Sequence, residues 1–249
     1  MTVILVTGGW PENIGRSTEA AAVRNQSYLN LLAERDLNKN SKVKRDPIGL
    51  RRLLASYSRN ISTGAALEAL AADSGLDRGT VSEYRDLLMR HMIVNDLPAW
   101  NTHIRSSARL RKSPRRHLCD PSLAAAALGV SDSALIDDME YFVSLFEALV
   151  VHEIRVLANL LDMTVGYYRD SYGDEVDILV EKRNGDFIAI EVKLGFAMQE
   201  SAAESLRRFE QKLTDKSRRT LKSMNVIVSS GLCHTRSDGI NVVPIGCLG

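Results

Sequence analysis

Between positions 46 and 100, apolar residues recur with the spacing of α-helices. The first predicted helix of this region carries on one face Ile48, Leu50, Leu53, Leu54 and Tyr57. A second predicted helix carries Leu67, Leu70 and Ala71. Ser62 or Thr63 is predicted as its N-cap, because a hydroxyl at that position accepts a backbone N–H of the first turn.

Residues 75–84 are predicted to form a tight turn that leads into a third helix. Gly75 stands in the turn, and Leu87, Leu88 and Met92 continue the helical period. Two short helices around a glycine-bearing turn form a helix-turn-helix pattern. With residues 93–97 as a candidate wing strand, we expect a winged helix-like domain over residues 46–100.

If this domain binds DNA, the helix after the turn would contact it through its outward-facing polar side chains. These are Arg78, Thr80, Ser82 and Arg85. Asp77, Glu83 and Asp86 lower the positive charge that contacts with phosphates require. A spacer or interaction module therefore stands as the alternative.

From residue 131 onward the pattern changes and predicts a helix, three strands, a helix and two strands. The fold class expected for the whole chain is α+β or α/β, a helical domain followed by an αβββαβ domain over residues 131–249. Its first helix, from about Asp138 to Leu161, is apolar on nearly every face and should be largely buried. Glu147 and Glu153 in this helix have apolar neighbours, and a carboxylate there requires a partner.

The second and third strands, 176–181 and 187–193, are predicted to pair as a hairpin whose register is fixed by burial. Val176, Ile178 and Val180 should share a face with the apolar row of Ile188, Ile190 and Val192. Pairing Ile178 with Ile190 meets this requirement and leaves a three-residue loop. Gly185 then occupies the left-handed position that such a loop requires.

The same register places Asp177 opposite Glu191, on the face away from the apolar row, with Lys193 on that face too. Two facing carboxylates repel each other unless a cation lies between them. Magnesium binds through one or two carboxylates plus substrate phosphate, so Asp177 and Glu191 are the predicted metal ligands. Lys193 would assist the attacking water or offset transition-state charge, and Glu147 would support the site. The alternative is a surface row in which Lys193 neutralises both acids.

Composition adds little to this picture until it is examined locally. The chain of 249 residues is 45% hydrophobic and 25% charged with a net charge of +1, as expected for an ordinary globular protein. One stretch, residues 101–117, is strongly basic and contains no acid: His103, Arg105, Arg109, Arg111, Lys112, Arg115, Arg116 and His117. It would either follow a phosphate backbone or serve as a solvated connector. With a short helix that starts at Asp120, it makes up a predicted connector over residues 101–130.

Several classes of function are excluded. Three distant cysteines form no metal or disulfide framework, the histidines lack zinc spacing, and no membrane span is present, so we expect a cytoplasmic protein. The run into Gly15, Arg16, Ser17 and Thr18 is not a phosphate loop, since Trp10 stands at the first glycine position and Arg16 at the lysine position. We expect Ser17 to cap a helix there, and no ATP site.

Asp177, the triplet Glu191-Val192-Lys193 and the helix with Phe146-Glu147 resemble the PD-(D/E)xK nuclease superfamily. Its core has the same order of helix, three strands, helix and strand, which implies a restriction-endonuclease-like fold.

Further short motifs are Gly8-Gly9-Trp10-Pro11-Glu12, Glu34-Arg35-Asp36, Leu97-Pro98-Ala99-Trp100, Lys112-Ser113-Pro114, Asp120-Pro121-Ser122-Leu123-Ala124 and Glu175-Val176-Asp177. Together they resemble bacterial and archaeal AAA-type ATPases that carry a C-terminal domain of unknown function. In that group a P-loop ATPase module precedes a winged helix and a nuclease-like domain. The ATPase module is missing here, so residues 1–45 would be its remnant tail, and an ATPase partner or a homo-oligomer is implied.

These observations predict a magnesium-dependent nuclease-like protein that acts on DNA phosphodiesters. Its catalytic residues would be Glu147, Asp177, Glu191 and Lys193. The alternatives are a catalytically silent DNA-binding or regulatory module, and a truncated partner subunit of an ATPase.

Overall fold

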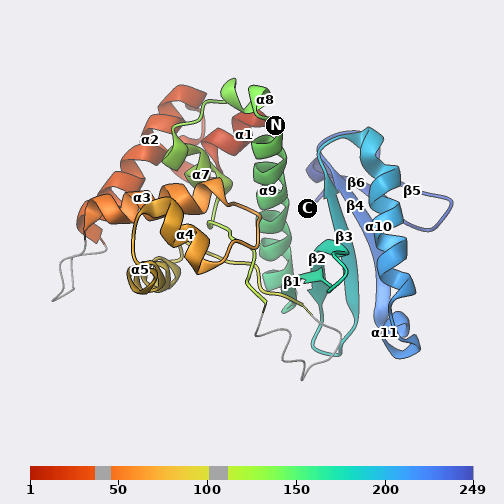
Figure 1. The fold of residues 1–249 in the computed structure, drawn as a ribbon. Helices are drawn as coiled ribbons and strands as arrows, with labels where there is room; N and C mark the ends of the chain where they lie inside the picture. Colours follow the sequence, from red (N-terminus) through yellow and green to blue (C-terminus); the bar gives the residue numbers. More distant parts are fainter. Residues whose placement is uncertain (37–45, 101–111, 249) are drawn as a thin grey trace. The chain divides into compact units, whose positions relative to one another are not determined.

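The first half of the chain is helical and the second half carries a six-stranded mixed sheet, as Figure 1 shows for a computed structural model. The structure describes residues 1–36, 46–100 and 112–248. The mixed α+β class expected from the sequence is confirmed. Contacts divide the chain into two units, Met1–Asp96 with Arg115–Leu149, and Leu97–Pro114 with Val150–Gly249.

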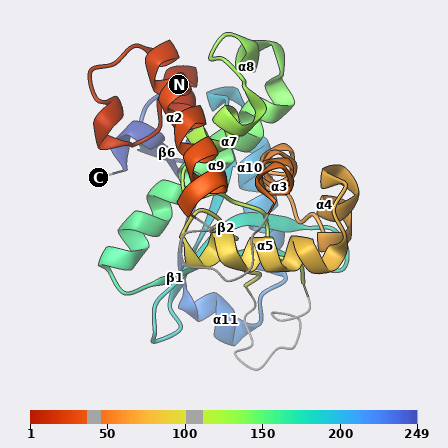
Figure 2. The same cartoon turned by 90° about the vertical axis from the view of Figure 1, so that its left-hand side faces the viewer.

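The first unit is built from helices (Figures 1 and 2). They are α1 (Thr2–Thr7), α2 (Thr18–Leu31), α3 (Pro47–Arg59), α4 (Leu67–Ser74), α5 (Arg78–Arg90), α7 (Pro121–Leu128), α8 (Ala134–Asp137) and the first half of α9 (Met139–Leu160), with short turns η1 (Pro11–Asn13) and η2 (Leu32–Asp36). α7 contacts α1, α2 and α3. Leu123, Ala124 and Ala125 of α7 are buried, so this apolar helix lies in the core of the unit.

The N-terminal apolar run is helical although three of its residues, Val3, Ile4 and Val6, are β-branched. Residues 3–6 lie within α1, where Leu5 and Val6 are buried while Val3 and Ile4 are exposed. Burial of one helical face against neighbouring helices outweighs the weak strand preference of β-branched residues. Ser17 caps α2 by accepting the N–H of Ala20 at 3.3 Å, which confirms the predicted cap.

The helix-turn-helix elements form as predicted, with one correction at the start. Gly75 ends α4 in the left-handed conformation with φ 66°, and Asp77 caps α5 by accepting the N–H of Thr80. The prediction that Ser62 or Thr63 caps α4 is wrong, because Ala66 precedes that helix. The Ser62 hydroxyl instead donates to the Ser144 carbonyl at 2.9 Å, and that of Thr63 donates to the Asn60 carbonyl at 2.8 Å.

Residues 93–97 do not form the predicted wing strand. Val94 and Leu118 form an isolated antiparallel bridge, supported by bonds from the Asn95 N–H to His117 and from the Cys119 N–H to Ile93. The predicted helices from Pro121 to Leu128 and from about residue 138 to residue 161 are confirmed as α7 and α9. None of the helices in the described part of the chain is long and apolar enough to cross a membrane.

The second unit is organised around the sheet, whose strand order is β1-β2-β3-β4-β6-β5. The strands are β1 (Thr164–Arg169), β2 (Glu175–Glu181), β3 (Phe187–Lys193), β4 (Leu221–Val228), β5 (His234–Thr235) and β6 (Asn241–Pro244). β2 pairs antiparallel with β1 and with β3, and β3, β4 and β6 run parallel. Helices α10 (Gln199–Gln211) and α11 (Asp215–Thr220), with turns η3 (Phe196–Met198) and η4 (Ile245–Cys247), complete this unit.

One face of the sheet packs against α10, which contacts β2, β3 and β4 (Figure 1). The core on this face combines strand residues such as Leu179, Ala189 and Val226 with Leu206 and Phe209 of α10. Trp100 joins the same core: its ring lies 4.8 Å from that of Phe187, and its indole N–H donates to Glu181 at 2.9 Å.

The predicted hairpin is confirmed in register and in loop. Ile178 pairs with Ile190, and the Lys182 N–H donates to the Asp186 carbonyl at 2.8 Å to close a three-residue loop. Gly185 has φ 87°, the left-handed conformation required at the end of such a loop.

Candidate active site

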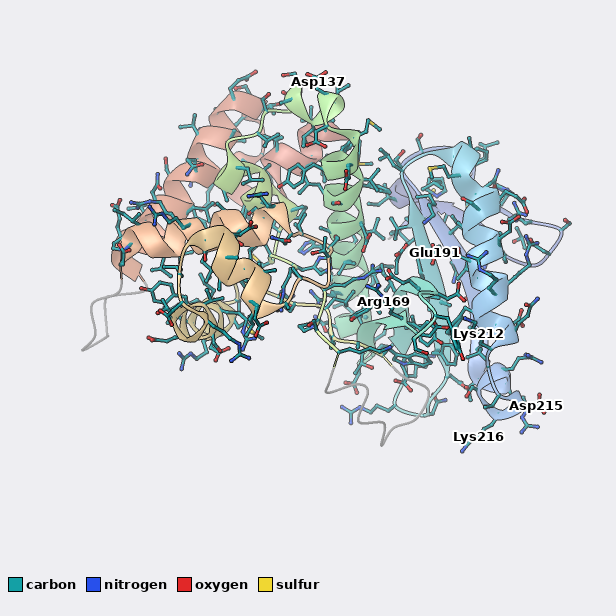
Figure 3. All side chains as sticks on the ribbon, in the orientation of Figure 1. Asp137, Arg169, Glu191, Lys212, Asp215 and Lys216 are labelled. Carbon is teal, nitrogen blue, oxygen red and sulfur yellow. The ribbon has the colours of Figure 1, made fainter. Side chains whose placement is uncertain are left out.

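The sheet topology brings the start of β2 and the ends of β3 and β4 together at one end of the strands. β2 runs antiparallel to β3 while β4 runs parallel to it, so the start of β2 lies beside the ends of β3 and β4. Asp177 lies near the start of β2, and Lys193 is the last residue of β3, paired with Val228 at the end of β4. Glu191, labelled in Figure 3, lies two residues before Lys193.

A β-bulge at the start of β2 sets the position of Asp177. Gly166 pairs with Leu179 and Tyr168 with Val176, so Asp177 and Ile178 together face the single residue Tyr167. Such a bulge interrupts the alternation of side chains and redirects one of them. Val176 consequently packs with Leu179 in the core against α10. The expectation that Val176 shares a face with Ile178 and Ile190 is therefore wrong.

The Asp177 carboxylate forms a hydrogen bond with the backbone of β3. The regular pairing of the two strands ends at Ile178 and Ile190, and beyond it the Val192 N–H donates to Asp177 Oδ2 at 2.9 Å. Asp177 is 9% exposed, so this bond lies in the protein interior. A charge-assisted bond to a backbone N–H holds the carboxylate in one orientation beside Glu191.

Glu191 and Lys193 form an ion pair at the same edge. Lys193 Nζ lies 3.1 Å from Glu191 Oε2, and the glutamate is only 4% exposed whereas the lysine side chain keeps 26% of its surface. The three ionised side chains Asp177, Glu191 and Lys193 together carry a charge of −1.

The donor chemistry of the site fits a hard divalent cation. Asp177 and Glu191 offer carboxylate oxygens, the ligand type that magnesium prefers. Within residues 1–36, 46–100 and 112–248, no three His, Cys, Asp or Glu side chains are grouped so that they could hold a metal ion. A magnesium ion here would therefore take its remaining ligands from water and substrate phosphate, as is usual for this ion.

Glu147 belongs to the first unit and has a partner there. Its carboxylate Oε1 accepts from Arg115 Nη1 at 2.6 Å, and both side chains are largely buried. The apolar surroundings of Glu147 did indicate that a partner was needed, but that partner is a basic residue of the chain. We leave Glu147 out of the site that Asp177, Glu191 and Lys193 form in the second unit.

The basic stretch divides into parts with different environments. Arg109 and Arg111 lie outside the described residues, and Lys112 is partly exposed. Arg115 and Arg116 are buried, the latter with Nη1 2.6 Å from Asp96 Oδ2. The expected solvent-facing position does not hold for these two arginines, because each forms an ion pair inside the first unit.

The polar residues of α5 are engaged locally. Arg78 pairs with Glu68 at 2.5 Å and Arg85 with Asp86 at 2.6 Å. The Thr80 hydroxyl donates to the Asp77 cap, while Ser82 is partly exposed. The helix therefore presents arginines whose charge is already offset by neighbouring acids.

The sequence assigned no role to Asp96 or to the ring pair of Phe196 and His234. Asp96 stands between Asn95 and Leu97, and no local pattern there indicates its buried partner Arg116, which lies 20 residues away. The two rings lie 5.8 Å apart although 38 positions separate them in the chain, so no local signal links them.

These features define an α+β protein with a helical N-terminal part and a sheet-based C-terminal part. A family model described as "Domain of unknown function (DUF8612)" matches residues 2–134, more than half of the chain, so the chain belongs to that family. A second model, "Domain of unknown function (DUF4143)", matches residues 143–248, and domains of that kind are found in AAA-ATPase-associated contexts. No curated protein and no solved structure matches the chain.

Proposed function

We propose that the second unit is a metal-dependent nuclease domain that cleaves DNA phosphodiesters at Asp177, Glu191 and Lys193. Two neighbouring contacts, at the end of the sheet where β2 starts and β3 ends, carry this proposal. Asp177 accepts the Val192 N–H, and the neighbouring buried Glu191 pairs with Lys193. Lys193 ends β3 beside the end of β4, and in open α/β sheets ligands bind outside the carboxyl ends of the strands.

The fold supports the proposal because the elements follow the order of the nuclease core resembled by the sequence. α9 is followed by β1, β2 and β3, then by α10 and β4. We accordingly propose a restriction-endonuclease-like fold for this unit. For the first unit we propose a helix-turn-helix DNA-binding role, supported by the geometry of α4 and α5.

In this proposal the three side chains divide the chemistry. Magnesium, when bound, would polarise the phosphoryl group and lower the pKa of a water molecule. Asp177 and Glu191 would hold the ion, with Asp177 oriented by the Val192 N–H. The Lys193 ammonium, which is the most exposed charge of the three, would offset negative charge that develops on the phosphoryl oxygens.

The ion pair between Lys193 and Glu191 also supports a second candidate, a catalytically silent DNA-binding module. In that case the lysine serves only to neutralise a buried acid. The two candidates differ in their response to divalent metal, because only the nuclease requires it.

The test is DNA cleavage in magnesium or manganese, with single-stranded, duplex and branched substrates. Asp177→Asn keeps the size of the side chain and removes its charge, and we expect a loss of at least about 100-fold in rate. Asp215→Asn is the matched control, since Asp215 is an exposed acid on α11 of the same unit (Figure 3). Absence of metal-dependent cutting in the unmodified chain, or full activity in Asp177→Asn, would contradict the proposal.

A further inference from the structure

We propose that Phe196 and His234 form a stacking platform for a base of single-stranded nucleic acid, beside the carboxylate site. This inference rests on the proposed function, because it names the substrate class of the same site. The ring centroids lie 5.8 Å apart with their planes inclined by 49°. Base faces stack on such side chains without requiring a particular sequence.

The backbone of the connection between β4 and β5 holds Phe196 in place. Gly231 has φ 127°, and a Cβ atom built there would lie 2.5 Å from the edge of the Phe196 ring. Only glycine leaves room for this ring, and it also tolerates the backbone conformation. The ring is therefore seated on the chain just beyond β4.

His234 is fixed by a bond of its own. Its Nδ1 lies 3.1 Å from the Leu232 carbonyl oxygen. Because a carbonyl oxygen can only accept, Nδ1 donates the proton, and the ring plane is fixed next to Phe196. A platform of two oriented rings loses little conformational freedom when a planar ligand binds.

The platform stands among apolar side chains that are open to solvent. Phe196 is 37% exposed, Met198 50% and Leu232 78%. Phe196 and Met198 belong to η3, Leu232 belongs to the connection between β4 and β5, and the Phe196 ring lies against Gly231 of that connection. Exposed apolar groups gathered in this way are typical of a binding surface.

The short distance along the chain between Phe196 and Lys193 favours a nucleic acid strand as the ligand of the platform. Phe196 follows Lys193 by three residues, so their Cα atoms lie at most about 11 Å apart. This span corresponds to about three nucleotide steps of a stacked strand. A phosphate at Lys193 and a base on Phe196 can therefore belong to the same short stretch of one strand.

The platform requires a base whose face is accessible. In a duplex each base is paired and stacked on both sides, and exposing it costs a few kcal/mol. Single strands and frayed ends offer such a face without that cost. We therefore assign single-stranded DNA, rather than intact duplex, as the preferred substrate of this edge.

The test measures the binding of a fluorescent single-stranded oligonucleotide to the full chain by fluorescence anisotropy. EDTA is present, so no metal-dependent cleavage occurs. A hairpin duplex of the same length is the second probe. Phe196→Ala should weaken single-strand binding about tenfold or more, while duplex binding stays unchanged. Phe196→Trp should retain binding and shows that the loss does not come from misfolding.

Leu232→Ala is the matched control, because it removes an exposed apolar side chain of the same patch without removing a ring. It should change binding less than threefold. Equal losses for Leu232→Ala and Phe196→Ala, an unchanged affinity in Phe196→Ala, or no single-strand binding by the unmodified chain would overturn the platform.

These outcomes separate the platform from the nuclease proposal. Metal-dependent cleavage that needs Asp177, together with single-strand binding that ignores Phe196, would leave the nuclease and remove the platform. Binding that depends on Phe196, in a chain that cuts no DNA with magnesium, would leave the platform and remove the nuclease.

Discussion

Asp96 and Arg116 form the ion pair whose disruption gives the clearest stability prediction. The guanidinium is 2% exposed and the carboxylate 6%, with 2.6 Å between Nη1 and Oδ2. Arg116 Nε also donates to the Ala65 carbonyl at 2.8 Å, and its Nη1 lies 3.4 Å from the Tyr57 hydroxyl. Asp96→Ala would leave a buried guanidinium without the carboxylate that it contacts.

The expected loss is about 3–5 kcal/mol of unfolding free energy, the range found when one partner of a buried pair is removed. An exposed pair should contribute much less, because water and salt screen its charges. Glu68→Ala provides this comparison in the same unit, because Glu68 and its partner Arg78 keep more than half of their side-chain surfaces. Replacing both members of the buried pair, as Asp96→Leu with Arg116→Met, should recover most of the loss.

Urea unfolding, monitored by tryptophan fluorescence, can measure the loss of stability in the first unit alone. The chain has two tryptophans, Trp10 in the first unit and Trp100 in the second. A Trp100→Phe background therefore leaves Trp10 as the only indole reporter. If Asp96→Ala shifted the midpoint no more than Glu68→Ala, the pair would not be a buried structural contact, and Arg116 would return as a candidate for DNA binding.

Three further changes test other parts of the structure. Gly185→Ala should destabilise the second unit by about 1–2 kcal/mol in a thermal melt, because alanine is strained at φ 87°. Gly246→Ala, where φ is not positive, should have little effect, and equal shifts of the two variants would contradict the loop geometry. Glu147→Gln should lower the urea midpoint of the first unit and leave any metal-dependent cleavage rate within about threefold, because the carboxylate is engaged by a buried arginine; a hundredfold loss of rate would restore a catalytic role. Lys212 lowers the pKa of Asp174, so Lys212→Met should cost stability at pH 7, and the difference should shrink as pH falls below about 3.8; a difference that persists at pH 2 would refute this linkage.

Local patterns predicted the parts of the fold that are determined locally. The pairing of Ile178 with Ile190 follows from burial and from the position of Gly185, both visible over a few residues. The cap at Ser17 and the glycine turn between α4 and α5 are likewise short-range features. These predictions hold because the residues that decide them are neighbours in the chain.

Features that depend on distant partners could not be predicted in the same way. The bulge opposite Tyr167 moves Val176 to the α10 face, and nothing near Val176 in the sequence signals it. Arg115 and Arg116 look like part of a basic surface, yet their acidic partners are 32 and 20 residues away. A run of positive charge does not distinguish a solvated surface from buried pairs.

The candidate site shows both cases together. Asp177, Glu191 and Lys193 were identified from the hairpin register, and the structure places them at one sheet edge. The contact between Asp177 and the Val192 N–H depends on the bulge and was not foreseen. Phe196 approaches Gly231 only through the parallel pairing of β3 with β4, so its position required the full topology.

The central claim is that Asp177 and Glu191 hold a divalent cation, and direct titration of manganese into the metal-free chain tests it most directly. The account predicts one ion bound per chain, with binding lost in Asp177→Asn and in Glu191→Gln and kept in Asp215→Asn. A chain that binds no ion, or one whose binding survives both substitutions, would contradict the account.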